Sequence, residues 1–138
     1  MEVDKLIQTA YEKAKKAQSH AHAPYSKFNV GAAIKFKNND EVFTGCNVEN
    51  ASFGATVCAE RGAIQTGIGV LGKQEIEFII VVTDTNPAIG PCGLCLQVIS
   101  EFAKKDTPIY LSNQNEIQTM ATFGEFLSAP FSEIPETI

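Results

Sequence analysis

The stretch IEFIIVVTDTNPAIGPCGLCLQ, residues 76–97, decides the fold because it joins a strand-like run to the start of a helix. Ile76–Thr83 is rich in β-branched and apolar residues, which favours a central strand buried on both faces. Asp84–Gly90 has the composition of a loop. Pro91 suits the first turn of a helix, which we expect to continue over Leu94–Lys105. A strand followed by a helix in this way predicts a sheet with helical cover.

The N-terminal third of the chain predicts a helix and a hairpin. Apolar residues recur at helical spacing over Val3–Ser19, which indicates an amphipathic helix. Apolar and other residues then alternate over Phe28–Phe36, as in a strand with at least one buried face. The turn residues Asn38, Asn39 and Asp40 lead into a return strand. We place that return strand at Glu41–Val48.

The other segments complete an alternating pattern of strands and helices. We expect a loop, a helix ended by glycines, a short strand, a weaker strand and a short helix at Asn50–Val57, Cys58–Gly67, Pro108–Ser112, Glu116–Ala121 and Phe123–Leu127. This order predicts an α/β fold of three layers (α/β/α), with a mixed sheet of about five strands and an antiparallel hairpin at one side. Residues 1–138 fit a single domain, the usual size for about 100–200 residues.

Composition excludes several classes of function. The net charge is −5, and the only cluster of basic residues, at Lys13, Lys15 and Lys16, is typical of a solvated helix face. The pI of the chain is near 5.0, which disfavours a polymeric nucleic acid as a partner. No apolar run is long enough to span a membrane, and the acidic N-terminus lacks a signal core, so we expect a cytoplasmic protein.

The spacing of the four cysteines points to a metal site. Disulfides are disfavoured without a secretory signal. Cys92 and Cys95 share one face of a helical turn, which suits zinc, a redox pair or two core cysteines. Cys58 opens another predicted helix, and the starts of two helices that follow strands meet at one sheet edge. Three thiols would leave the fourth position of a catalytic zinc to water. Cys46 is a weaker fourth candidate because it lies in a strand.

Glu60 is the candidate acid–base group. It lies two residues from Cys58, from where its carboxylate can reach a water on the metal. The alternative is a solvated glutamate favoured by the helix dipole. His20 and His22 precede Pro24 and are more typical of surface or loop histidines than of metal ligands.

Five segments together resemble the zinc-dependent cytidine deaminases. Cys58–Arg61 reads CAER and Pro91–Gln97 reads PCGLCLQ; the resemblance extends over Pro24–Ala33, Gly45–Ser52 and Glu125–Phe131, in family order. Three cysteines, rather than a histidine and two cysteines, resemble the small homotetrameric branch that acts on free nucleosides. The resemblance implies a cytidine deaminase-like fold.

The activity implied by the resemblance is hydrolytic deamination of cytidine and 2′-deoxycytidine to the uridines, with ammonia released. Zn²⁺ is the implied cofactor, with Cys58, Cys92 and Cys95 as ligands. Glu60 corresponds to the group that takes a proton from water and passes it to the ring and the departing amine.

The resemblance also implies how a nucleoside would bind. Phe28 corresponds to an aromatic residue that packs on the pyrimidine, and Ala59 supplies a backbone group to the base. Asn47 and Glu49, two residues apart, correspond to the pair that hydrogen-bonds the ribose 3′-hydroxyl. Phe131 corresponds to a phenylalanine that reaches the site of a neighbouring subunit.

Arg61 corresponds to an arginine beside the zinc thiolates, where it would withdraw negative charge. The alternative interpretation is that Arg61 forms an ion pair on the protein surface. The sequence departs from the family pattern nearby. Leu96 replaces the usual arginine after Cys95. We therefore expect Arg61 to offset more of the negative charge of the thiolates. Phe53 stands where many members have tyrosine.

Two other readings remain open at this stage. The first keeps the chemistry but changes the substrate to a base-modified or 4-substituted nucleoside, or to an aminonucleoside antibiotic such as blasticidin S. Asn47 and Glu49 argue for a ribose. The second is a structural zinc or interaction module without turnover, against which the lack of a convincing fourth ligand and the presence of Glu60 both speak.

Overall fold

A five-stranded sheet forms the centre of the computed structural model, which describes residues 1–138. The strands are β1 (Gly31–Phe36), β2 (Val42–Cys46), β3 (Ile76–Val82), β4 (Pro108–Ser112) and β5 (Ile117–Thr122). Their order across the sheet is β2-β1-β3-β4-β5. β3 and β4 are parallel and the other neighbours are antiparallel, so the predicted mixed sheet with a hairpin at one side is confirmed.

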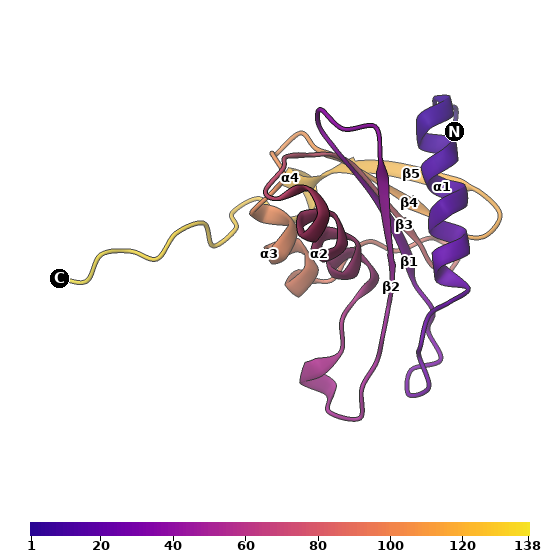
Figure 1. Ribbon diagram of the computed structural model, residues 1–138, viewed down its shortest axis with the longest axis horizontal. Helices are drawn as coiled ribbons and strands as arrows, with labels where there is room; N and C mark the ends of the chain where they lie inside the picture. Colours follow the sequence, from indigo (N-terminus) through magenta and orange to yellow (C-terminus); the bar gives the residue numbers. More distant parts are fainter.

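Helices cover both faces of this sheet. α1 (Lys5–Gln18) lies on one face, and α2 (Ala59–Leu71) and α3 (Gly93–Ser100) lie on the other (Figure 1). A 3₁₀ turn at Phe53–Ala55 precedes α2, and the short helix α4 (Phe123–Phe126) follows β5. The predicted three-layer α/β/α fold is therefore confirmed. No helix of the structure is both long enough and apolar enough to cross a membrane.

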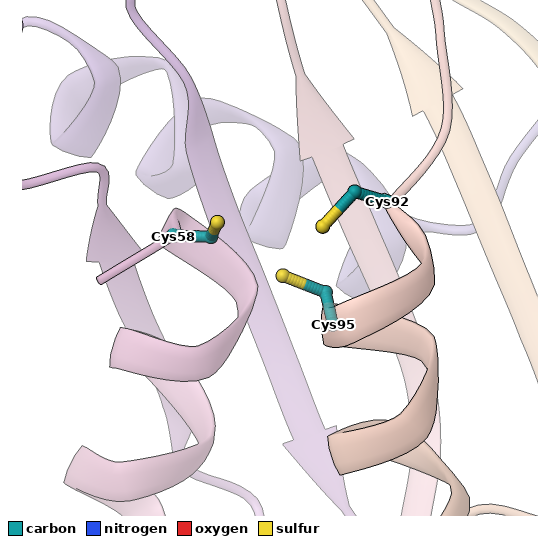
Figure 2. A group of neighbouring side chains, drawn as sticks. All are labelled: Cys58, Cys92 and Cys95. Atoms are coloured by element: carbon teal, nitrogen blue, oxygen red, sulfur yellow. The ribbon is translucent and has the colours of Figure 1, made fainter. Parts of the chain in front are cut away.

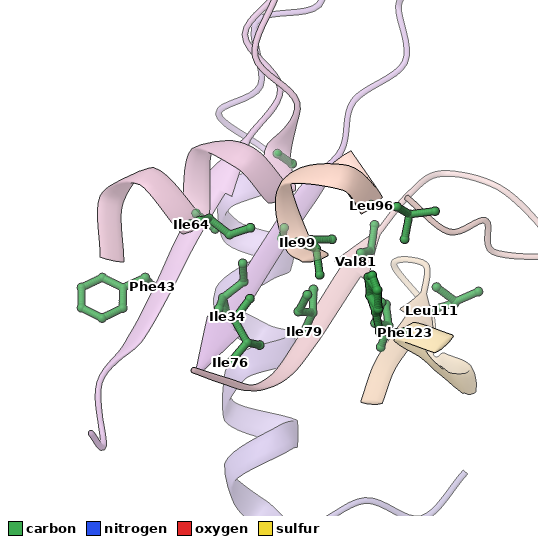
Figure 3. Packing of buried hydrophobic residues seen from close by; sticks show 14 of the residues in the cluster. Ile34, Phe43, Ile64, Ile76, Ile79, Val81, Leu96, Ile99, Leu111 and Phe123 are labelled. Carbon is green, nitrogen blue, oxygen red and sulfur yellow. The ribbon is translucent and has the colours of Figure 1, made fainter. Parts of the chain in front are cut away.

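A separate hydrophobic cluster fills each interface between the layers. The cluster between the sheet and the α2–α3 layer includes Ile34, Ile79 and Ile99 (Figure 3). The cluster beneath α1 includes Tyr11 and Ile80. Because neighbouring residues of β3 point to opposite faces, β3 contributes to both clusters, as expected of a strand buried on both sides.

β1 is shorter than the strand that alternation predicted over Phe28–Phe36. It begins at Gly31 because the preceding backbone is held by a side chain: Asn47 donates to the Phe28 carbonyl and accepts from the Val30 N–H. Lys27, at φ 60°, is in the left-handed region and turns the chain before the strand. Phe28 therefore belongs to a loop.

α2 continues past Gly67, where its end was predicted. Gly67 is a close-approach position, since a Cβ there would lie 2.3 Å from Cε2 of Phe36 on β1. The helix ends at Leu71, followed by Gly72 at φ 76°. A glycine selected for packing can therefore imitate a helix stop.

α3 ends at Ser100, before the predicted Lys105. The Phe102 carbonyl accepts a hydrogen bond from the Ile76 N–H at 2.8 Å, which turns the chain out of the helical path and ties it to the start of β3. The residues that position the thiols lie at the opposite end of α3 and are unaffected by this difference.

Candidate metal centre and active site

Three thiols converge from the first turns of α2 and α3. Cys58 and Cys92 are the N-cap residues of these helices, and Cys95 lies in the first turn of α3. Their sulfur atoms all lie within 4.8 Å of one another, and Figure 2 shows the three side chains between the neighbouring starts of the two helices. We call this group the thiol triangle. The predicted convergence at two helix starts is present in the structure.

Close packing of α2 on β2 sets one side of the thiol triangle. A Cβ at Gly45 would lie 2.3 Å from the Ala59 carbonyl oxygen, so only glycine allows the first turn of α2 to approach β2 this closely. Ala59 itself is fully buried. The position of Cys58 therefore follows from helix–sheet packing.

The environment of the triangle favours the thiolate form of Cys58. A hydrogen bond from the Cys95 thiol and the neighbouring Arg61 guanidinium lower the pKa of Cys58 to about 5. The same hydrogen bond, together with burial, raises the pKa of Cys95. A helix N-terminus adds a favourable field for a negative sulfur.

The donor set fits zinc. Tetrahedral coordination with Zn–S bonds of about 2.3 Å places two sulfur atoms about 3.8 Å apart, which is compatible with three sulfur atoms that all lie within 4.8 Å of one another. Cys46 is not among the converging groups, and neither His20 nor His22 is. Three thiol ligands would leave one position for water or substrate, which is the pattern of catalytic rather than structural zinc.

Glu60 lies in the first turn of α2 and is only 4% exposed. Burial, reinforced by the negative charge of Cys58, raises the pKa of Glu60 to about 7. The carboxyl lines the same cavity of ≈ 310 Å³ as Cys58 and Cys92. A solvated helix-start glutamate would be exposed, so the structure contradicts that alternative.

Arg61 is the cation that contacts the triangle. Its Nη2 donates to the Thr56 carbonyl at 3.0 Å and to the Cys58 sulfur at 3.5 Å. Its buried Nε has no partner within the protein, so the guanidinium retains a donor for a further acceptor. Leu96, where an arginine was expected, is 6% exposed and belongs to the hydrophobic cluster beneath α2 and α3. Arg61 therefore contacts the thiol triangle and forms no ion pair with a carboxylate in this structure.

Another part of the cavity lining comes from loops. We call this part the loop side and define it by Ser26, Phe28, Asn47 and Glu49. Asn47 is 7% exposed and uses both ends of its carboxamide on the backbone of the Phe28–Val30 segment. The predicted pair Asn47 and Glu49 does line one cavity, but both residues lie just beyond the end of β2.

Glu49 is half-buried, and its carboxylate is already hydrogen-bonded within the protein. Hydrogen bonds from the Ser26 hydroxyl and from the Ser26 and Tyr25 N–H groups hold the pKa of Glu49 below its usual range. A partly solvated carboxylate with three donors needs no further partner to be stable.

Phe131 does not line the cavity of its own chain. Its side chain is 63% exposed, in the tail that extends from the body of the molecule in Figure 1. The Gln97 carboxamide donates to the Phe131 carbonyl at 2.7 Å and accepts from its N–H at 3.3 Å. The tail is therefore anchored to α3 by its backbone, with the ring left free.

Sequence reasoning missed much of the cavity lining. The missed residues are Ser26, Val30, Thr56, Val81, Thr83, Ile89 and Gly90. Most lie in connections between elements, where periodicity carries no information. Ser26 had one usable signal, since a serine beside Pro24 and Tyr25 is typical of a turn whose hydroxyl bonds nearby backbone.

Comparison with known proteins agrees with this geometry. The family model for the cytidine and deoxycytidylate deaminase zinc-binding region matches residues 4–111. A cytidine deaminase of Sporosarcina psychrophila is 38% identical over 133 residues, covering 96% of this chain and 93% of that protein. One from Halalkalibacterium halodurans is 41% identical over 126 residues, covering 91% and 93%. The crystal structure of cytidine deaminase from Burkholderia pseudomallei has a TM-score of 0.82 at 39% identity, covering 90% of this chain and 98% of that one.

The three-layer fold and the thiol triangle define the class: an α/β protein with a cluster of three thiols that fits a zinc ion. The family model spans most of the chain, and similar proteins align over nearly its whole length. The chain belongs to the cytidine and deoxycytidylate deaminase family.

Proposed function

We propose that the protein catalyses hydrolytic deamination of cytidine and 2′-deoxycytidine, giving the corresponding uridine and ammonia. One observation carries this proposal: a buried carboxyl, Glu60, shares a cavity of ≈ 310 Å³ with the thiols of Cys58 and Cys92. Solved and curated relatives named cytidine deaminase, similar over nearly the whole chain, support the same reaction.

Zinc is the proposed cofactor, with Cys58, Cys92 and Cys95 as ligands. When bound there it supplies Lewis acidity, which lowers the pKa of its water to about 7. Arg61, in contact with the Cys58 sulfur, offsets part of the negative charge that three thiolates bring to the site.

Glu60 is the proposed proton carrier. It accepts one proton from the attacking water and passes it to N3 of the pyrimidine, while the water oxygen adds to C4. Glu60 then transfers the second proton from that oxygen to the exocyclic amine, which leaves as ammonia. The product keeps a proton on N3 and a carbonyl at C4, so atoms and charge balance. Burial keeps bulk water away from the carboxyl during both transfers.

The loop side and α2 are the proposed nucleoside contacts. Phe28 packs on the pyrimidine and the Ala59 backbone meets its polar edge. Asn47 and Glu49 face the ribose 3′-hydroxyl. Phe28, Asn47 and Glu49 line one cavity together with Glu60, which supports a nucleoside as the ligand.

The direct test is zinc content and cytidine absorbance on one purified sample. We expect about one zinc per chain and a loss of cytidine absorbance with stoichiometric ammonia. Zinc without turnover of cytidine, 4-substituted cytidines or blasticidin S would instead indicate a structural zinc module. Turnover of only a modified or antibiotic substrate would move the proposal to that substrate class.

We also propose that this single domain assembles as a homotetramer whose cavities are completed by the Phe131 ring of a neighbouring subunit. The exposed ring on a backbone-anchored tail supports this arrangement. Four chains of 14.9 kDa should scatter light as a particle of about 60 kDa. A fully active monomer contradicts it.

The reactive thiols suit a reducing, cytoplasmic setting, and the reaction suits pyrimidine salvage.

Hybrid assemblies test the shared site. Phe131→Ala should raise KM for cytidine about tenfold, the size of one base–aromatic contact, with zinc unchanged. Mixing it with an inactive Glu60→Gln protein, after dissociation and reassembly, should restore a fraction of sites to normal KM, because intact rings then meet intact carboxyls. A simple average of the two parent activities would mean that Phe131 acts within its own chain.

A further inference from the structure

The segment that carries Phe28 has no strand ladder to hold it. It lies before the start of β1, and Lys27 in this segment has φ 60°, a conformation that a lysine adopts only under constraint. The Lys27 N–H donates to the Ala23 carbonyl at 3.0 Å, which closes the turn. Apart from this bond and the one from the Asn47 N–H to the Val30 carbonyl, side-chain hydrogen bonds hold the backbone at Phe28.

Two side chains grip the Phe28 backbone from opposite ends. The Asn47 Nδ2 donates to the Phe28 carbonyl at 2.7 Å, and the Ser26 hydroxyl accepts from the Phe28 N–H at 3.0 Å. The hydroxyl in turn donates its own proton to Glu49 Oε2. The chain Phe28 N–H, Ser26 Oγ, Glu49 Oε2 is continuous and runs along one wall of the cavity.

Glu49 is nearly saturated by this loop. Its Oε1 accepts from the Tyr25 and Ser26 N–H groups, each at 3.0 Å, and its Oε2 accepts from Ser26 Oγ. An ionised carboxylate offers about four acceptor sites, so roughly one remains. The hydroxyl of Ser26 therefore decides which direction of Glu49 stays open to a substrate donor.

We propose that Ser26 is a positioning residue that couples the aromatic base contact of Phe28 to the sugar-reading carboxylate of Glu49. The inference rests on the proposed function, because it assigns Phe28 to the base and Glu49 to the 3′-hydroxyl. Ser26 touches neither the thiol triangle nor Glu60, so it acts on substrate binding and not on the chemical step.

The test compares Ser26→Ala with Ser26→Thr, which keeps the hydroxyl, and with Ser19→Ala. Ser19 is a matched exposed serine whose hydroxyl bonds only the α1 backbone, at Lys16. Ser26→Ala should raise KM for cytidine about tenfold, near the size of one hydrogen bond to a charged group, with kcat within about twofold. KM for 3′-deoxycytidine should rise less, so discrimination for the 3′-hydroxyl shrinks. Ser26→Thr and Ser19→Ala should resemble the unchanged protein.

Amide hydrogen exchange gives a readout that does not need activity. The Phe28 N–H loses its acceptor in Ser26→Ala and should exchange about tenfold faster, but not in Ser26→Thr. Unchanged exchange, or an equal fall in kcat/KM for both nucleosides through kcat, overturns the coupling. If the zinc-loaded parent protein turns over neither nucleoside while Ser26→Ala still frees the Phe28 amide, the proposed function fails and the positioning role stands.

Discussion

Cys58 and Cys92 of the thiol triangle line the same cavity as the loop side, but the triangle and the loop side are built in different ways. The thiol triangle comes from two helix starts, each fixed by packing of a helix on the sheet, as at Gly45 against Ala59. The loop side comes from segments outside the strand ladder, fixed by side-chain hydrogen bonds such as those of Asn47.

The difference separates rigidity from adaptability. Groups that must meet one metal within a few tenths of an ångström sit on helices anchored in the hydrophobic core. Groups that meet a sugar and a base sit on loops held by hydrogen bonds of modest net strength. We therefore expect changes at the thiol triangle to abolish function outright and changes at the loop side to alter affinity.

Removal of one thiol should have the largest effect. Cys92→Ala should leave fewer ligands than a zinc site needs, with zinc falling far below one per chain and cytidine turnover lost. Cys46→Ala is the matched control, because Cys46 lies outside the triangle. Metal analysis and the absorbance assay on both variants check this. A zinc content and a cytidine turnover equal to those of the parent protein in Cys92→Ala would contradict the assignment of Cys92 as a ligand.

Loss of the guanidinium should have an intermediate effect. Arg61→Lys keeps the charge but cannot span the Thr56 carbonyl and the Cys58 sulfur with one planar group. We expect zinc affinity to fall about 10–100-fold, as for other groups that support metal ligands. Competition with a chelator measures the zinc affinity. An affinity equal to that of the parent would show that the contact with Cys58 does not support the metal.

Loss of the Asn47 carboxamide should have the smallest effect of the three. Asn47→Ala leaves the Phe28 carbonyl and the Val30 N–H without this partner, which should cost about 1–3 kcal/mol of unfolding free energy. KM for cytidine should rise while zinc stays bound. Urea denaturation, the cytidine absorbance assay and metal analysis check these three parts. Loss of zinc in this variant would mean that the two sides of the cavity are not separately built.

Sequence patterns predicted the thiol triangle better than the loop side, for physical reasons. The spacing of Cys92 and Cys95 and the position of Cys58 at a helix start are local features, and helices that follow strands bring such starts together. The grip of Asn47 on the Phe28–Val30 segment joins residues 17 and 19 positions apart and leaves no periodic trace. The alternation of apolar residues predicted a strand from Phe28 because it carries no sign of these long-range hydrogen bonds, and β1 begins only at Gly31.

Glycines explain the main boundary error. The sequence suggests that Gly67 ends a helix, but Gly67 lies within α2. Its lack of a side chain makes room for the ring of Phe36 on β1. Only three-dimensional packing distinguishes these two uses.

The central claim is that Glu60 carries protons next to a zinc held by three thiols, and Glu60→Gln tests it most directly. The amide has nearly the shape of the carboxyl but cannot shuttle a proton, so the fold and about one zinc per chain should be retained. Turnover of cytidine should fall by about 10⁴-fold or more, since general acid–base groups contribute about 10²–10⁴-fold and this one serves several steps. Retained zinc with a fall of less than tenfold would show that Glu60 is a buried structural carboxyl and that another group moves the proton.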